Sequence, residues 1–85
     1  MDPLYRLKFT IGPAEVVNES EQSVGTEKLD KGSEFRIVRT KHLWAVEPGA
    51  TAFEAYTILC HGKMYNVFWN VLEPAMEQVK PSTGA

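Results

Sequence analysis

Apolar and polar residues alternate along the first segment of the chain, residues 4–11. The apolar positions are Tyr5, Leu7, Phe9 and Ile11, and the polar positions between them are Arg6, Lys8 and Thr10. A period of two is typical of a strand that buries one face, so a strand is predicted here. Gly12 and Pro13 interrupt it, and because proline has no N–H for a sheet ladder, a bend, bulge or strand end is expected. Residues 15–17 are predicted to continue as a second short strand.

The next segment, residues 18–32, lacks this alternation. It reads NESEQSVGTEKLDKG, and its apolar residues are Val24 and Leu29. The composition predicts a long surface loop, attached to the body of the domain at those two side chains. Loops beyond about 12–15 residues are uncommon in compact domains and are often functional. A functional loop and a plain solvated connection are both open at this point.

A turn signal, DKGS at residues 30–33, precedes two predicted strands. The first covers residues 34–40 and the second residues 43–47, with Lys41 and His42 between them. The first strand carries apolar residues on one face, and the second contains the unbroken apolar run LWAV. A Pro-Gly turn closes the second strand.

A hairpin is predicted from residues 53–60 and 64–69. The sequence FEAYTILC is rich in aromatic and β-branched residues and is apolar on both faces in its second half, which suits a central strand. The connection contains Gly62, which can adopt the positive φ that a tight hairpin needs.

Beyond this hairpin the sequence predicts a single short helical turn. Asn70 can cap its start, and Glu73, three residues on, can complete a capping box. Pro74 limits its length, because a proline ring clashes with the carbonyl four residues earlier in an established helix. One 3₁₀ or short α-helical turn is therefore expected, followed by a flexible tail over residues 80–85.

These elements define one all-β domain over residues 1–79. About five short strands with turns between them predict a small five-stranded barrel or a strongly bent antiparallel sheet, with one short helical turn near the C-terminus. The order of a long early loop, a central hairpin, a helical turn and a short last segment resembles the Src-homology-three type of barrel. The resemblance lies in the pattern of elements. That family's acidic specificity loop and paired aromatics are not in register here, so its proline-rich ligand is not implied.

Composition places the chain among globular single domains. Its 85 residues are 44% hydrophobic and 24% charged, and a chain this short cannot divide into two cores. The single cysteine, Cys60, excludes an intramolecular disulfide, whereas a secreted domain of this size usually carries several cysteines. The N-terminal segment lacks the pattern of a signal peptide, and no apolar run reaches the length of a membrane span. A cytoplasmic protein is expected.

No catalytic, cofactor or metal site is predicted. Cys60 and His61 are a candidate nucleophile and base, but neighbouring residues of a strand point to opposite faces. A buried cysteine beside a turn histidine is therefore the preferred interpretation. Methionines apart, Cys60, His61 and His42 are the only soft or borderline metal ligands, and three are too few for a structural zinc site. The chain also contains no phosphate-binding glycine motif and no nucleophile-elbow motif.

Basic and aromatic residues supply the candidate binding site. The basic group consists of Arg36, Arg39, Lys41 and His42. Phe35, Phe53, Tyr56 and Phe68 are assigned to the core, because aromatic side chains dominate the burial of small domains. A chain this short has room for about one fully buried tryptophan. One of Trp44 and Trp69 is therefore expected at the surface, where tryptophan is enriched in binding hot spots.

Two functional hypotheses follow. The first is a non-enzymatic protein-binding module, acting as an inhibitor, adaptor or assembly subunit through an aromatic surface patch, with another protein or its own copy as partner. Its predicted partner-binding residues are Trp44, Trp69, Tyr65, Arg36, Arg39 and Lys41. The alternative is a small β-barrel that binds single-stranded nucleic acid through Arg36, Arg39, Lys41 and the nearby aromatics. The net charge of −2 disfavours the alternative, because phosphate neutralisation supplies much of such affinity. An enzyme using Cys60 ranks last, and no membrane partner is expected.

Overall fold

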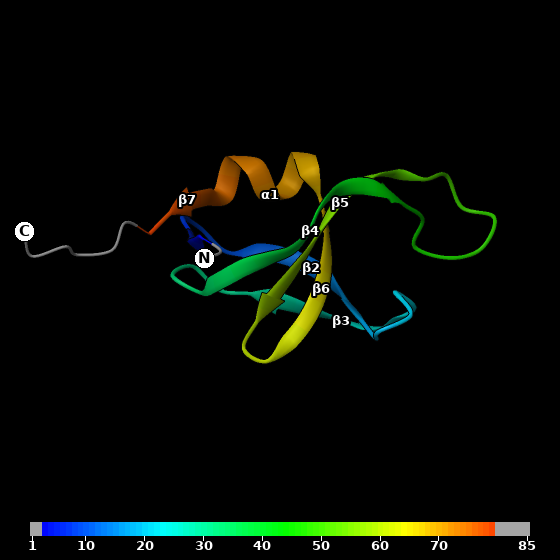
Figure 1. The fold of residues 1–85 in the computed structure, drawn as a ribbon, viewed down its shortest axis with the longest axis horizontal. Coiled ribbons are helices and arrows are strands. Elements are labelled where there is room, and N and C mark those ends of the chain that lie inside the picture. The colour runs from blue at the N-terminus through cyan, green and yellow to red at the C-terminus, as the bar shows by residue number, and fades with distance from the viewer. Residues whose placement is uncertain (1–2, 80–85) are drawn as a thin grey trace, which may run out of the picture.

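The computed structural model describes residues 3–79, which form an antiparallel β-sheet with one short helix (Figure 1). The elements are β1 (Leu4–Leu7), β2 (Ile11–Val17), β3 (Ser23–Leu29), β4 (Glu34–Trp44), β5 (Phe53–Cys60), β6 (Lys63–Phe68), α1 (Trp69–Ala75) and β7 (Met76–Gln78). The sheet has seven strands in the order β3-β2-β6-β5-β4-β1-β7. The all-β prediction with one short helix is confirmed, but the sheet has more strands than expected and is not closed into a barrel. The predicted tail, residues 80–85, lies outside the described residues.

The N-terminal alternation was predicted to form one strand, and the structure divides it. β1 ends before residues 8–10 and β2 begins after them, and the intervening Phe9 is 47% exposed. The irregularity expected at Gly12 is confirmed as a register shift after Ile11, inside β2. Gly12 has a φ of 152°, and a Cβ at this position would lie 3.0 Å from the Cα of Lys28. The close approach of β2 and β3 therefore requires glycine.

Residues 18–32 do not form the predicted long loop. β3 pairs antiparallel with β2, so this segment contains the turn and the second strand of a hairpin. The prediction was wrong because β3 is an edge strand, paired along one side. Leu29 is its one buried residue, so the strand shows no alternation of apolar and polar positions.

β4 joins two strands that were predicted separately. It runs from Glu34 to Trp44 without a break, and its register against β5 shifts after Ile37 and again after Arg39. The polar pair at residues 41–42 is thus accommodated by irregular pairing within one strand. Bulges of this kind bend a strand and increase its twist. The residues after Trp44 belong to the β4–β5 loop, so the predicted strand over residues 43–47 ends early.

β5 and β6 form the predicted hairpin, although β6 ends at Phe68 and Trp69, predicted as the last residue of the strand, is the first residue of α1. His61 and Gly62 make the hairpin turn with positive φ values of 53° and 77°, as a primed two-residue turn requires. The predicted capping box at Asn70 does not form. The N-cap of α1 is Phe68, which makes no side-chain capping bond, and Asn70 lies within the helix. Pro74 lies one residue before the helix ends.

The main core lies between one face of the bent sheet and α1. Its buried residues come from β1 to β6 and from the helix: Leu7, Ile11, Ala14, Leu29, Phe35, Ile58, Cys60, Tyr65, Val67, Leu72 and Ala75. A second cluster on the other face of β5 contains Val17, Trp44 and Ala55, with Met64 and Phe68 packed against it. Of the aromatics assigned to the core, Phe35 is buried, and Tyr56 and Phe68 are half-buried. Phe53 is 55% exposed, so its assignment was wrong.

Candidate functional site

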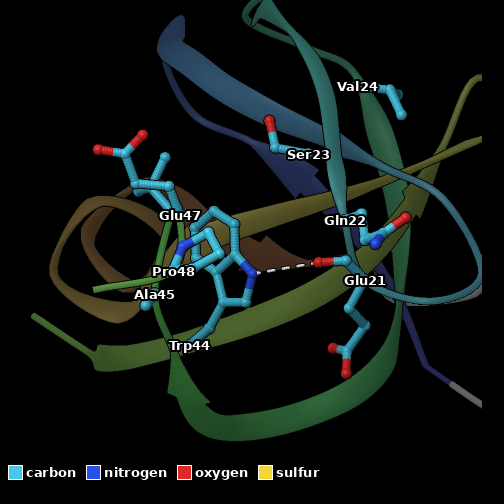
Figure 2. Close-up of a pocket in the computed structure, with 9 residues that line it drawn as sticks. Glu21, Gln22, Ser23, Val24, Trp44, Ala45, Glu47 and Pro48 are labelled. Carbon is cyan, nitrogen blue, oxygen red and sulfur yellow. Dashed lines mark hydrogen bonds between the residues drawn. The ribbon is translucent and has the colours of Figure 1, made fainter. Parts of the chain in front are cut away.

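Two connections of the sheet enclose a groove of about 590 Å³. One wall is formed by residues 21–24, at the β2–β3 turn and the start of β3 (Figure 2). The other wall is formed by residues 44–48, at the end of β4 and the start of the β4–β5 loop. Figure 1 shows both connections at the end of the molecule away from β7. Val24 belongs to the first wall and Val46 to the second, and they are 63% and 41% exposed.

The first wall is shaped by a turn that Asn18 braces. Its Oδ1 accepts hydrogen bonds from the backbone N–H groups of Ser20 and Gln22, at 2.9 Å and 3.0 Å. The backbone N–H of Asn18 donates to the carbonyl of Gln22, at 3.1 Å. Asparagine favours such turns because its short side chain can bond to the backbone two residues on. The bracing places Glu21 at the tip of the hairpin, facing the end of β4.

Glu21 connects the two walls through three residues of β4. Its carboxylate forms an ion pair with Arg39 through Oε2 and lies 3.1 Å from the Nε2 of His42 through Oε1. Its carbonyl accepts a hydrogen bond of 3.4 Å from the indole Nε1 of Trp44, drawn in Figure 2. Glu21 has a φ of 60°, a left-handed conformation that costs free energy for a residue with a Cβ. These contacts with β4 hold it in that conformation.

A row of aromatic rings extends from the groove to a second hollow. The centroid of the Trp44 ring lies 5.5 Å from that of Phe68, which lies 5.9 Å from that of Phe53 in an edge-on arrangement. Phe53, Phe68, Trp69 and Asn70 line the hollow, which has a volume of about 240 Å³. Trp69 is 42% exposed. The rings therefore give the groove and the hollow a shared apolar base.

Lys41 lies beside this hollow, over the face of Trp69. Its Nζ is 5.2 Å from the ring centroid, within the range of a cation–π contact, and 3.8 Å from a carboxylate oxygen of Glu73. Glu73 also accepts a hydrogen bond of 2.6 Å from the hydroxyl of Tyr56, and this bond raises the pKa of Tyr56 to about 12. Two residues along β4 from Lys41, Leu43 is 72% exposed.

The structure brings some of the predicted partner-binding residues together and separates others. Lys41 contacts Trp69, and Arg39 is joined to Trp44 through Glu21. Trp44 is 8% exposed, so Trp69 is the surface tryptophan. Tyr65 is 1% exposed in the main core, and its hydroxyl donates to Glu27, so its ring forms no part of the surface. Arg36 lies on β4 opposite Leu59 of β5, apart from the groove lining.

Sequence reasoning missed five residues of this region: Glu21, Val24, Leu43, Val46 and Phe53. Val24 was expected to attach its segment to the body of the domain, but it is 63% exposed, so that expectation was wrong. Glu21 was hidden because the segment around it was interpreted as a loop. Phe53 was assigned to the core by residue type, although its place at the first position of a strand is one signal of exposure. Leu43 and Val46 belong to an apolar run that gives no alternation from which to tell the exposed face.

Cys60 and His61, the candidate nucleophile and base, lie outside the groove and the hollow. Cys60 is buried, and its burial raises the pKa of the thiol. The ring of His61 lies 3.2 Å from the hydroxyl of Ser33 through Nε2. Within residues 3–79 no group of three or more histidine, cysteine, aspartate or glutamate side chains could hold a metal ion. None of the helical segments described here has the length and apolar character needed to cross a membrane.

Comparison of the chain with protein-family models, curated proteins and solved structures finds no match.

Proposed function

We propose that this protein is a non-enzymatic binding module that docks on another protein at the groove end of its sheet. We define the docking surface by five exposed apolar side chains: Val24, Leu43, Val46, Phe53 and Trp69. Their exposed fractions range from 41% to 72%. Large apolar side chains gathered in one region mark interaction sites, whereas singly scattered ones are ordinary. Val24 and Val46 line the groove and Phe53 and Trp69 line the hollow, and this grouping is the observation that carries the proposal.

The shape of this region suits a protein partner. The groove and the hollow offer two concave places for a partner's side chains, on either side of the aromatic row formed by Trp44, Phe68 and Phe53. Trp69 is the proposed anchor, because it stands at the hollow with its ring face covered on one side by Lys41. A partly packed tryptophan of this kind is typical of the centre of a protein–protein interface.

The charges around the docking surface favour protein over nucleic acid. Arg39 is paired with Glu21, and Lys41 lies near Glu73. These carboxylates offset the positive charge that would hold phosphates, and the whole chain carries a net charge of −2. Single-stranded nucleic acid therefore remains the alternative occupant, to be distinguished by the salt dependence of binding.

The arrangement of strands supports a finer proposal. After β1 comes the β2–β3 hairpin, then β4, β5 and β6, and α1 leads to β7, which pairs with β1. We propose that this is a variant of the Src-homology-three arrangement that acts as an inhibitor, adaptor or assembly subunit. Burial raises the pKa of the Cys60 thiol and so disfavours the nucleophilic thiolate, which supports the non-enzymatic assignment.

The experiment compares two truncations of equally exposed apolar residues. Trp69, 42% exposed, lies in the docking surface, and Leu59, 41% exposed, lies elsewhere on β5. A partner isolated with the native protein from its host is purified, and its affinity is measured against Trp69→Ala and Leu59→Ala variants that both melt cooperatively. Loss of a hot-spot side chain is expected to weaken binding about thirtyfold for Trp69→Ala, with less than about a twofold change for Leu59→Ala.

Equal weakening by the two variants would contradict the proposed surface. Weakening by Arg36→Ala with Arg39→Ala, combined with a steep loss of affinity as salt rises, would replace the proposal with nucleic-acid binding. Sedimentation of the protein alone over a range of concentrations tests whether the partner is a second copy of the chain.

A further inference from the structure

The groove end of the molecule holds more carboxylates than arginine and lysine side chains. The arginine and lysine described there, Arg39 and Lys41, each form an ion pair, with Glu21 and Glu73 respectively. Among the described residues, three further carboxylates of this end are exposed and form no ion pair: Glu19, Glu47 and Glu54. The docking surface is therefore bordered by negative charge that the chain leaves unpaired.

These three carboxylates lie beside the apolar part of the docking surface. Glu47 lines the groove, and Glu19 lines the hollow that adjoins the β2–β3 turn. Glu54 follows Phe53 on β5 and is the register partner of Leu43 on β4. A partner that covers the docking surface brings its own rim against these carboxylates, and complementary charge there requires lysine or arginine. The chemistry that fits is an exposed apolar side chain surrounded by basic ones.

The opposite end of the molecule presents this chemistry. Phe9, between β1 and β2, is 47% exposed and belongs to neither core cluster. Three lysines of this end are exposed and form no ion pair within the described part of the chain: Lys8, Lys28 and Lys31. We define the basic end by Phe9 and these three lysines.

Contacts between distant segments bring the basic end together. The backbone N–H of Lys31 donates to Oγ1 of Thr10 at 3.1 Å. A Cβ at Gly12 would lie 3.0 Å from the Cα of Lys28, so β3 also approaches this connection closely. The β3–β4 turn therefore lies along the segment that contains Phe9. Figure 1 shows this turn at the β7 end of the molecule, away from the β4–β5 loop.

Fewer carboxylates accompany the basic end than the groove end. Asp30 lies in the β3–β4 turn, next to Lys31. Glu34 is the register partner of Arg6, which forms an ion pair with Glu77. Among the described residues, four basic side chains thus stand against three carboxylates here, whereas Arg39 and Lys41 stand against five at the groove end. The two ends differ in the sign of their net charge.

We infer that the docking surface takes the basic end of a second copy of this chain, so that copies associate head to tail. The inference rests on the proposed docking surface and names its partner. Phe9 of one copy packs against the apolar side chains of the next, and the lysines meet the unpaired carboxylates around them. The two contacting surfaces differ, so every pair of copies retains one free surface of each kind. Association therefore continues beyond the dimer unless the copies close into a ring.

The test uses the purified protein alone, in sedimentation velocity from about 10 μM to about 1 mM at low salt. The native chain is expected to form species larger than a dimer as its concentration rises. Trp69→Ala disables the docking surface and Phe9→Ala disables the basic end. Loss of either aromatic anchor is expected to weaken self-association about thirtyfold. Each variant is first shown to melt cooperatively, and Phe9 lies outside both core clusters.

Mixing the two variants identifies the head-to-tail contact. Each variant retains the surface that the other has lost, so the mixture is expected to form a one-to-one dimer and no larger species. Leu59→Ala, which is as exposed as Trp69 but lies at neither surface, is expected to associate like the native chain.

Charge reversal tests the ionic part of the contact. Lys8→Glu with Lys31→Glu, and separately Glu47→Lys with Glu54→Lys, place like charges on the two contacting surfaces of one chain. Each double variant is expected to lose self-association, and a mixture of the two is expected to regain it, because opposite charges then meet at both kinds of junction.

A native chain that stays monomeric up to about 1 mM would overturn the inference. A dimer that Trp69→Ala abolishes and Phe9→Ala leaves intact would also overturn it, because two docking surfaces would then face each other. The proposed function is judged separately, by the effect of Trp69→Ala on the affinity for a partner isolated from the host.

Discussion

Replacing Thr57 with valine is expected to destabilise the domain by about 2 kcal/mol. Thr57 and Asn66 are direct register partners of β5 and β6, and they are 3% and 2% exposed. The Thr57 hydroxyl donates to Oδ1 of Asn66 at 2.6 Å. Valine has nearly the same shape but no hydroxyl, so Asn66 Oδ1 stays buried and loses its donor. Such an orphaned polar atom costs about 1–3 kcal/mol.

The assay is thermal and urea unfolding followed by circular dichroism. For a domain of this size, a loss of about 2 kcal/mol lowers Tm by roughly 8–16 °C. The double variant with Thr57→Val and Asn66→Leu removes both polar groups, and it is expected to recover most of that loss because no buried atom is left without a partner. A Thr57→Val variant that melts within about 2 °C of the native protein would refute the reasoning, as would purely additive effects in the double variant.

Three further predictions concern the core and the alkaline limit of stability. Cys60→Ala is expected to lower the free energy of unfolding by about 1 kcal/mol. The native thiol is expected to react slowly with a labelling reagent, because burial raises its pKa, and rapid labelling would contradict this. Leu72→Ala, at a position 0% exposed between α1 and the sheet, is expected to cost about 2–5 kcal/mol in urea unfolding, and a smaller loss would show that the helix contributes little. The hydrogen bond to Glu73 raises the pKa of Tyr56 to about 12, and burial raises the pKa of Tyr65 to about 12. In the folded state both phenols have a pKa above 10.0, the ordinary value expected in the unfolded state. Their contribution to the free energy of unfolding is therefore expected to be complete below about pH 10 and to be lost as the pH rises toward 12. Urea midpoints that stay constant over this interval would show that the two phenols titrate normally.

The local pattern of the sequence determined several elements of this protein. The run FEAYTILC and the short turn after it predicted the β5–β6 hairpin, because a central strand is apolar on both faces and a primed turn needs positive φ. Gly12 predicted an irregularity, and Pro74 predicted a short helix, through the backbone conformations that these residues allow. The burial of Cys60 also followed from its place at the end of a central strand.

The tertiary structure decided what depends on neighbours distant in the sequence. β3 is polar along most of its length, and it is a strand because β2 offers it a ladder of backbone hydrogen bonds. Trp44 is buried because the bend of β4 packs its ring against Phe68. Trp69 is exposed because it is the first residue of α1, at the edge of the hollow. Glu21 and His42 meet because the β2–β3 turn and the end of β4 lie together. Side-chain burial and pairing are set by which chain segments pack against each other, and residue type and spacing along one segment do not encode that packing.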